Sequence, residues 1–462
     1  MFFKIFVLAY VFLIGFFLIN YIDKKIAIGE KIGLSIPLGF GLITILMILL
    51  NSMKVEFNLL NLIASSFLFN GLIGFSYFRK TNFKDFLNID LSTLKKIKSF
   101  NLSWIFLFIV LCYIVYGISA KALFWPPAAY DTLTGYDYMA KVTAAEGKFD
   151  NSIFDQINPT HSIRHSYPPF AAGSYALAYM LGFQSSKISM LLIFVSLIIY
   201  FWSFLRKYTS ETAAIFFTLL MFSVPEFLGM SALSLTNVPQ TLFASAGLLA
   251  IYEYHREQRI NHFILGIVLL SLNSWTRGDG IVFILGGGLM LLYHFILNKV
   301  LKWKYLVVYF IFSVLPFLIW QFFLKMKIPN AYGNSDVFVK YPFWDGEKIG
   351  ELIGLVWDII TNTQYYGLVF LLFAILFLLN IKFLKNDNLI LLIGVFSTFL
   401  IYLFMYYQMD NGSDKFGYSL ASMINASFKR GLFPFIPVIV FYMGSLTITT
   451  RFFKWIYKPI IK

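Results

Sequence analysis

The stretch from Gly280 to Leu297 reads GIVFILGGGLMLLYHFIL, and it decides the kind of fold that this sequence encodes. It contains no lysine, arginine, aspartate or glutamate. About 20 helical residues cross the roughly 30 Å hydrocarbon core of a bilayer, so we expect a membrane-spanning helix here. The run Gly286-Gly287-Gly288 predicts close packing against a neighbouring helix, because no strand or Lys-Ser/Thr pair accompanies it as in a phosphate-binding loop.

The composition of the whole chain agrees with this interpretation. Of its 462 residues, 59% are hydrophobic and 13% are charged, whereas about a quarter of a soluble protein is charged. The mean hydropathy is +0.74. These values exclude a cytosolic enzyme, a disordered protein and a secreted disulfide scaffold. The single cysteine, Cys112, also excludes disulfides within the chain and cysteine-based metal sites.

Similar apolar runs predict an all-α polytopic membrane protein with about 13 transmembrane helices and long outer loops. The expected spans lie near residues 1–22, 32–50, 59–78, 102–119, 188–205, 212–230, 238–254, 262–275, 280–297, 305–324, 366–379, 389–407 and 431–449. The apolar segment 170–183 is shorter, and we expect a helix in one membrane interface there. We divide the chain into three N-terminal helices with a basic loop (1–101), a core (102–324) and a C-terminal part (325–462).

The charged residues predict the orientation in the membrane. The connections 23–31, 79–101, 205–211, 255–261, 298–304 and 380–388, with the tail from residue 450, hold 22 of the 37 lysines and arginines. About 15 of the 23 acidic residues lie on the other side, mostly in the long loops 120–187, 325–365 and 408–430. By the positive-inside rule the short basic loops face the cytoplasm. The net charge of +14 is therefore a topology signal and does not indicate a nucleic-acid partner.

The first long outer loop holds the most informative polar residues. Residues 126–141 read PPAAYDTLTGYDYMAK, directly after a predicted span. A helix from Thr132 to about Glu146 would end at Gly147 and place Asp131 at its N-cap. A capping role and a role as catalytic base are both open for Asp131, since both need a carboxylate fixed at the helix start.

Two further features of this loop each have a structural and a functional interpretation. Asp137 and Lys141 are four residues apart, which is the spacing of an ordinary ion pair. Residues 161–170 read HSIRHSYPPF, and the two prolines fit the first turn of the following helix. Arg164 and His165 would lie at the level of the lipid headgroups, where they suit binding of a phosphate carried by a lipid.

Together these features resemble the GT-C superfamily of polyprenyl-phosphate-dependent membrane glycosyltransferases, which includes protein O-mannosyltransferases and the aminoarabinose transferase of lipid A. Three features of the first long loop carry the resemblance. They are Asp131 just after a span, a tyrosine-rich helix with Lys141, and Tyr167-Pro168-Pro169 at the start of an apolar helix. Pro225-Glu226 with LTNVP at 235–239, WTRGDG at 275–280 and KRGLFPFIP at 429–437 resemble later turns of the family. The resemblance covers roughly residues 102–450 and leaves the first three predicted helices outside it.

The resemblance implies transfer of a sugar from a polyprenyl phosphate to a glycan, lipid or protein acceptor at the outer membrane face. A polytopic protein without cysteine pairs or a retrieval signal also fits a bacterial inner membrane. It implies Asp131 as general base, with Asp137 as its nearest competitor. The residues implied in binding the donor phosphate are Lys141, Arg164, His165, Arg277 and Arg430. Those implied in binding substrate are Tyr130, Tyr167, Asn237 and Asp279. For Arg277 and Arg430, an arginine that merely extends to the lipid headgroups is an equally good interpretation.

We favour a mechanism without a metal and assign no metal ligands, and the alternative is a divalent metal with Asp279 as a substitute ligand. Some members of the superfamily hold a divalent metal with acids of the first two outer loops, but Asn237 stands where the second acid is common. The five histidines also form no metal-binding pair on a helix. The expected partners are the lipid-linked sugar, its acceptor and membrane lipids.

Two other functions are compatible with the sequence. A polysaccharide polymerase or ligase would share the long outer loop but would depend on outer-loop arginines and not on Asp131. A transporter or lipid flippase would need ionisable residues along a pathway through the spans, and these are nearly absent from the predicted helices.

Overall fold

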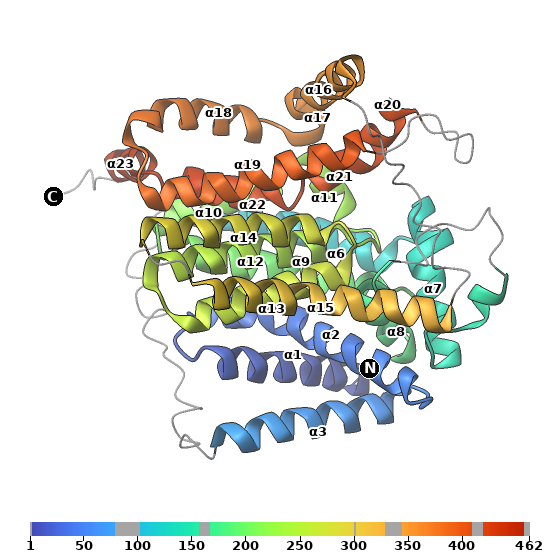
Figure 1. Ribbon diagram of the computed structural model, residues 1–462. Coiled ribbons are helices and arrows are strands. Elements are labelled where there is room, and N and C mark those ends of the chain that lie inside the picture. The colour runs from blue at the N-terminus through green and yellow to red at the C-terminus, as the bar shows by residue number, and fades with distance from the viewer. Residues whose placement is uncertain are drawn as a thin grey trace. The chain divides into compact units, whose positions relative to one another are not determined.

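The computed structural model describes residues 2–78, 102–156, 167–299, 302–328, 344–408 and 419–456, and every regular element in these ranges is a helix (Figure 1). Within these described ranges, seven helices are long and apolar enough to cross a membrane, or eight if the bent pair Leu420–Gly431 and Phe435–Ser445 forms one span. The protein is thus an all-α, multi-pass membrane protein. It folds as two compact units, Met1–Thr218 with Ser231–Pro239 (unit 1) and Leu219–Met230 with Gln240–Lys462 (unit 2).

Unit 1 contains the N-terminal helices and the first long loop. Its helices are α1 (Phe2–Ile22), α2 (Ile28–Ser52), α3 (Leu59–Phe78), α6 (Leu102–Phe124), η1 (Thr132–Tyr136), α7 (Asp137–Glu146), η2 (Ser152–Gln156), α8 (Phe170–Met180) and α9 (Lys187–Leu205). The chain passes from unit 1 to unit 2 within α10 (Glu211–Phe222), returns to unit 1 after Met230, and passes to unit 2 again within α12 (Asn237–Glu257).

Helix α2 forms the centre of unit 1, where it packs against α1, α8 and α9. The backbones of α1 and α2 touch where Gly15 and Gly39 face the partner helix. A Cβ atom on Gly15 would lie 1.8 Å from the carbonyl oxygen of Ser35, and one on Gly39 would lie 2.1 Å from that of Val11. Small residues therefore set the distance between these helices, which lie side by side with α3 in Figure 1.

Unit 2 contains the remaining helices. They are α11 (Pro225–Met230), α13 (Ile260–Thr276), α14 (Gly280–Leu297), α15 (Trp303–Lys327), α16 (Gly346–Thr361), α17 (Thr363–Tyr366), α18 (Val369–Asn380), η4 (Ile381–Phe383), α19 (Asn386–Tyr407), α20 (Leu420–Met423), η5 (Ile424–Phe428), α21 (Lys429–Gly431), α22 (Phe435–Ser445) and α23 (Thr447–Ile456).

Helix α14 packs against α13, α15 and α19 within unit 2. The predicted role of its glycine run is confirmed. A Cβ atom on Gly286 would lie 1.8 Å from Oγ1 of Thr398 on α19, and one on Gly287 would lie 2.4 Å from the hydroxyl of Tyr309 on α15. The absence of side chains thus lets two neighbouring helices approach α14 closely.

A helix coincides with each of the 13 predicted spans, but several of these helices are too short or too polar to qualify as spans by themselves. The segment 212–230 breaks into α10 and α11 before Pro225, and the segment 431–449 contains a bend of 52° between Leu420–Gly431 and Phe435–Ser445. Proline lacks a backbone N–H and interrupts the helical hydrogen bonds. Helix α12 is long enough, but it buries polar side chains such as Gln240 and Glu253.

The basic connections 23–31 and 205–211 lie at the opposite end of unit 1 from Asp150 of the first long loop. Near the start of α2, Lys31 donates to Asn20 at 2.6 Å, and Lys207 lies 2.9 Å from Glu30. Near its end, Asn51 donates to Asp150 of the first long loop at 2.9 Å. For the described residues of unit 1, the connections predicted to face the cytoplasm and the loop predicted to face outward thus lie at different ends of α2.

Candidate functional site

The first long loop enters a helical segment soon after α6 ends. Gly147 terminates α7 with a positive φ of 63°, as predicted for a helix C-terminus. Asp131 has helical backbone angles (φ −58°, ψ −30°), and its side chain makes no capping hydrogen bond. The N–H of Leu133 bonds to the carbonyl of Ala129 at 2.9 Å, so the first turn begins before Asp131. The N-cap prediction is therefore wrong, because Asp131 lies inside the first turn, near the positive end of the helix dipole.

Polar side chains from four segments converge on Asp137 at the start of α7. Tyr179 of α8 and Ser186, just before α9, each donate to Oδ1 of Asp137 at 2.5 Å. Nζ of Lys141 lies 3.1 Å from Oδ2, which confirms the predicted ion pair. Oγ of Ser234 lies 2.6 Å from Oγ of Ser186 and joins the segment 231–239 to the network. We call these five residues the Asp137 cluster.

Burial decides what Asp137 can do chemically. The residue is 1% exposed, and both of its carboxylate oxygens have partners. Burial, followed by the hydrogen bond to Asp137, raises the pKa of Tyr179, so this hydroxyl remains a donor at neutral pH. An acceptor substrate cannot reach such a carboxylate without displacing its partners. Asp137 therefore suits a positioning role, whereas Asp131 is partly exposed.

A buried lysine fixes the beginning of the loop. Lys187, the first residue of α9, is 1% exposed. Its Nζ donates to the carbonyl of Lys121 at 2.9 Å and to the carbonyl of Trp125. A cation at a helix C-terminus stabilises the helix dipole and satisfies carbonyls that have no partner within the helix. The point from which the chain leaves α6 towards Asp131 is thus held in place.

The other predicted residues of unit 1 differ in their exposure. Tyr130 is 64% exposed, and Asn237, at the start of α12, is buried. The ring of Tyr167 packs against that of Tyr136 with centroids 5.9 Å apart. Arg164 and His165 lie outside the described residues. Of this predicted set, Asp137 and Lys141 are in direct contact.

In unit 2, the turn between α13 and α14 brings together two more predicted residues. Nη2 of Arg277 lies 3.0 Å from Oδ2 of Asp279, and both side chains are about one-tenth exposed. Gln240 of α12 donates to Oδ1 of Asp279 at 2.8 Å. Arg277 and Asp279 were predicted to bind donor phosphate and substrate, respectively, and here they bind each other. A ligand phosphate would have to compete with Asp279 for this guanidinium.

The second basic site of unit 2 lies around α21. Arg430 donates from Nε to the carbonyl of Ala426 at 2.6 Å. Its neighbour Lys429 lies 2.8 Å from Oε1 of Glu226 on α11 and 4.1 Å from the ring centre of Tyr365. The ion pair of Lys429 and Glu226 thus joins α21 to α11, two segments that belong to separate motifs of the sequence resemblance.

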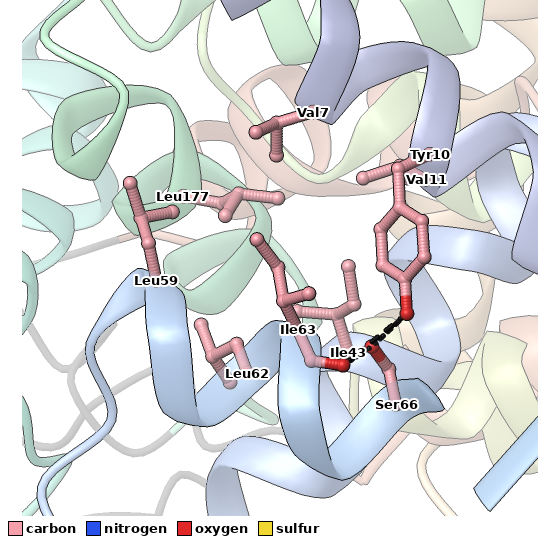
Figure 2. A pocket seen from close by; sticks show the side chains of 9 residues that line it. All are labelled: Val7, Tyr10, Val11, Ile43, Leu59, Leu62, Ile63, Ser66 and Leu177. Atoms are coloured by element: carbon pink, nitrogen blue, oxygen red, sulfur yellow. Dashed lines mark hydrogen bonds between the residues drawn. The ribbon is translucent and has the colours of Figure 1, made fainter. Parts of the chain in front are cut away.

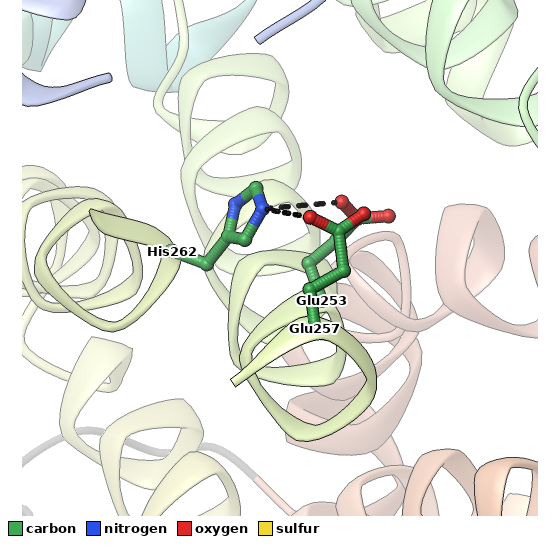
Figure 3. A group of neighbouring side chains, drawn as sticks. All are labelled: Glu253, Glu257 and His262. Atoms are coloured by element: carbon green, nitrogen blue, oxygen red, sulfur yellow. Dashed lines mark hydrogen bonds and ion pairs between the residues drawn. The ribbon is translucent and has the colours of Figure 1, made fainter. Parts of the chain in front are cut away.

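A third polar group, missed from the sequence, lies where α12 meets α13. Glu253, Glu257 and His262 each offer a ligand atom, and these atoms all lie within 4.8 Å of one another (Figure 3). The signal that could have revealed it is the i, i+4 pair of glutamates at the end of a predicted span, followed by a histidine at the start of the next.

A small apolar cavity in unit 1 is lined by α1, α2, α3 and α8 (Figure 2). Its volume of about 10 Å³ corresponds to roughly one water molecule. Tyr10 and Ser66 are its polar residues, and their hydroxyl oxygens lie 2.8 Å apart. This cavity is too small for a sugar.

No family model matches this chain, and neither a curated protein nor a solved structure matches it.

Proposed function

We propose that the protein is an integral membrane glycosyltransferase of the GT-C type, with thirteen membrane crossings and its active site on the outer face of a bacterial inner membrane. It would move a sugar from a polyprenyl phosphate to a hydroxyl or amine of a glycan, lipid or protein. Support comes from the multi-pass helical fold, from the motifs along residues 102–450 and from the folded first long loop.

The observation that carries the proposal is the position of Asp131. It lies in the first turn of a helical segment that directly follows α6, and it is partly exposed. The Asp137 cluster and Lys187 hold the two sides of this segment, so a rigid frame presents one accessible carboxylate close to the end of an apolar helix. A general base needs this combination of access and fixed position.

The reaction assigns a different task to each type of residue. The acceptor O–H or N–H loses its proton to Asp131 while its heteroatom forms a bond to the anomeric carbon. The bond between that carbon and the phosphate oxygen breaks, and the electron pair leaves with the polyprenyl phosphate. Cationic side chains near the headgroups stabilise the leaving phosphate. Lys141 is the described candidate nearest to Asp131 in the chain, and its side chain is 52% exposed.

The test uses membranes that contain the full-length protein and a polyprenyl phosphate carrying a radiolabelled hexose or pentose. We expect Asp131→Asn to reduce transfer of label by about 100-fold or more, since general base catalysis contributes roughly 10²–10⁴-fold. Asp358→Asn serves as the matched control, because Asp358 is exposed on α16. Wild-type transfer rates in the Asp131→Asn membranes would contradict the proposal and would favour a polymerase or ligase that depends on arginines.

A further inference from the structure

The turn between α12 and α13 brings three metal-ligand side chains to one point of unit 2. Glu253 and Glu257 are four residues apart on α12 and lie on one helical face. His262 is in the first turn of α13, beyond a connection of two residues. Gln258 in that connection has a φ of +54°, which is uncommon for a residue other than glycine. The tight turn thus holds the two helix ends together.

The ligand atoms have the separations that a small metal ion requires. Nε2 of His262 lies 3.1 Å from Oε2 of Glu257 and 3.6 Å from Oε2 of Glu253. Ligands bound to tetrahedral zinc at roughly 2.0–2.1 Å lie about 3.3 Å from one another. Figure 3 shows that one edge of the imidazole is directed at both carboxylates. An ion placed between the three atoms would need little rearrangement of the side chains.

Burial distinguishes this group from an ordinary surface ion pair. The side chains of Glu253 and His262 are 2% and 4% exposed, whereas that of Glu257 is 44% exposed. A protonated Nε2 has one N–H and can donate one good hydrogen bond, and its 3.6 Å distance to Glu253 is longer than such a bond. A metal ion would instead accept electron pairs from all three groups. Glu257 would provide its entry from solvent.

The donor set selects the class of cation. Calcium and magnesium prefer sites made only of oxygen ligands, and copper(I) prefers sulfur. One imidazole with two carboxylates suits zinc and related divalent ions, and three protein ligands leave one position for water. We infer that Glu253, Glu257 and His262 form a binding site for a divalent transition-metal ion of the zinc type.

Arg259 competes with the ion for one ligand. Its Nη1 lies 3.0 Å from Oε2 of Glu257, the same oxygen that faces His262. Metal binding would displace this guanidinium from Oε2 of Glu257. Removal of the guanidinium is therefore expected to strengthen metal binding.

The test is a Zn²⁺ titration of the full-length protein in detergent, after treatment with a chelator, with a chromophoric chelator as competitor. We expect one Zn²⁺ per chain at this site. Glu257→Gln is expected to weaken it by roughly tenfold or more, and Arg259→Gln to strengthen it. The side chain of Glu257 is 44% exposed, so its variant is expected to fold, and size-exclusion chromatography checks this. Glu351→Gln makes the same chemical change at an exposed position on α16 and is expected to leave binding unchanged.

Two results would overturn the inference. One is the absence of stoichiometric Zn²⁺ binding by the wild-type protein. The other is binding that survives Glu257→Gln but disappears in His255→Gln, which would assign the ion to the nearby pair His255 and His294, whose Nδ1 atoms lie 2.9 Å apart. The site is separate from the proposed transfer reaction, so failure of either proposal leaves the other standing.

Discussion

At the scale of single residues, the Asp137 cluster predicts a stability effect. Asp137→Asn removes the charge that faces Lys141 and weakens the bonds from Tyr179 and Ser186. Because the group is buried, we expect the free energy of unfolding to fall by roughly 1–3 kcal/mol. Heat-induced unfolding of the purified protein in detergent measures this as a lower midpoint. Asp358→Asn is the control, and an equal midpoint for both variants would show that the Asp137 bonds contribute nothing to stability.

The members of this cluster differ in how far the sequence could predict them. Asp137 and Lys141 are four residues apart on one helix, so their spacing was sufficient to predict their ion pair. Tyr179 and Ser186 reach Asp137 from positions 42 and 49 residues further along the chain, and Ser234 contacts Ser186 from 48 residues beyond that serine. A helical period carries no information about such contacts. The sequence also could not predict the exact first residue of the helical segment near Asp131. An aspartate that caps a helix and an aspartate in the first turn of a helix occur in similar sequence patterns.

At the scale of helices, the crossing of α1 and α2 predicts a strong effect of a single methyl group. A Cβ atom on Gly15 would meet the backbone at Ser35 and Gly39, which cannot rotate away. We expect Gly15→Ala to destabilise the protein by roughly 1–3 kcal/mol or to prevent its accumulation in the membrane.

The matched control for this crossing is Gly71→Ala on α3, where a Cβ atom would have no neighbour within 4 Å. That substitution is expected to be neutral or to stabilise slightly, by about 0.5–1 kcal/mol, because alanine favours a helix more than glycine. The measurement is again the unfolding midpoint in detergent. Similar midpoints for the two alanine variants would contradict the close contact between α1 and α2.

Hydropathy located the helices better than it located their breaks. Each apolar run coincides with a helix, because the run needs internal hydrogen bonds wherever it lies in lipid. The breaks before Pro225 and near Pro434 follow from proline chemistry, but the same chemistry tolerates proline inside α2 and α15. Which prolines interrupt a helix is decided by packing around them. The polar face of α12, with Gln240 and Glu253, is likewise explained by its burial inside the protein.

At the scale of the whole molecule, the separation of charge predicts a topology. The basic side chains Lys31 and Lys207 gather at one end of unit 1, and Asp150 of the first long loop lies at the other. In unit 2 both ends hold an ion pair, Arg256 with Asp387 at 3.3 Å near the C-terminal end of α12 and Arg277 with Asp279 at 3.0 Å in the turn after α13, so its orientation is predicted from the basic connections in the sequence. If the basic ends face the cytoplasm, the proposed active site faces outward.

Single cysteines can test this topology, because the chain has only Cys112, which is exposed on α6 and can be replaced by alanine. Lys25→Cys and Lys382→Cys report on the basic ends, and Glu56→Cys and Asp358→Cys report on the opposite ends; all four positions are exposed. A membrane-impermeant maleimide added to intact spheroplasts is expected to label Glu56→Cys and Asp358→Cys, and to label the other two only after permeabilisation. The reverse pattern would contradict the outward active site. Equal labelling of Lys25→Cys and Glu56→Cys would contradict a membrane crossing by α2, whose 25 residues span about 37 Å of helix.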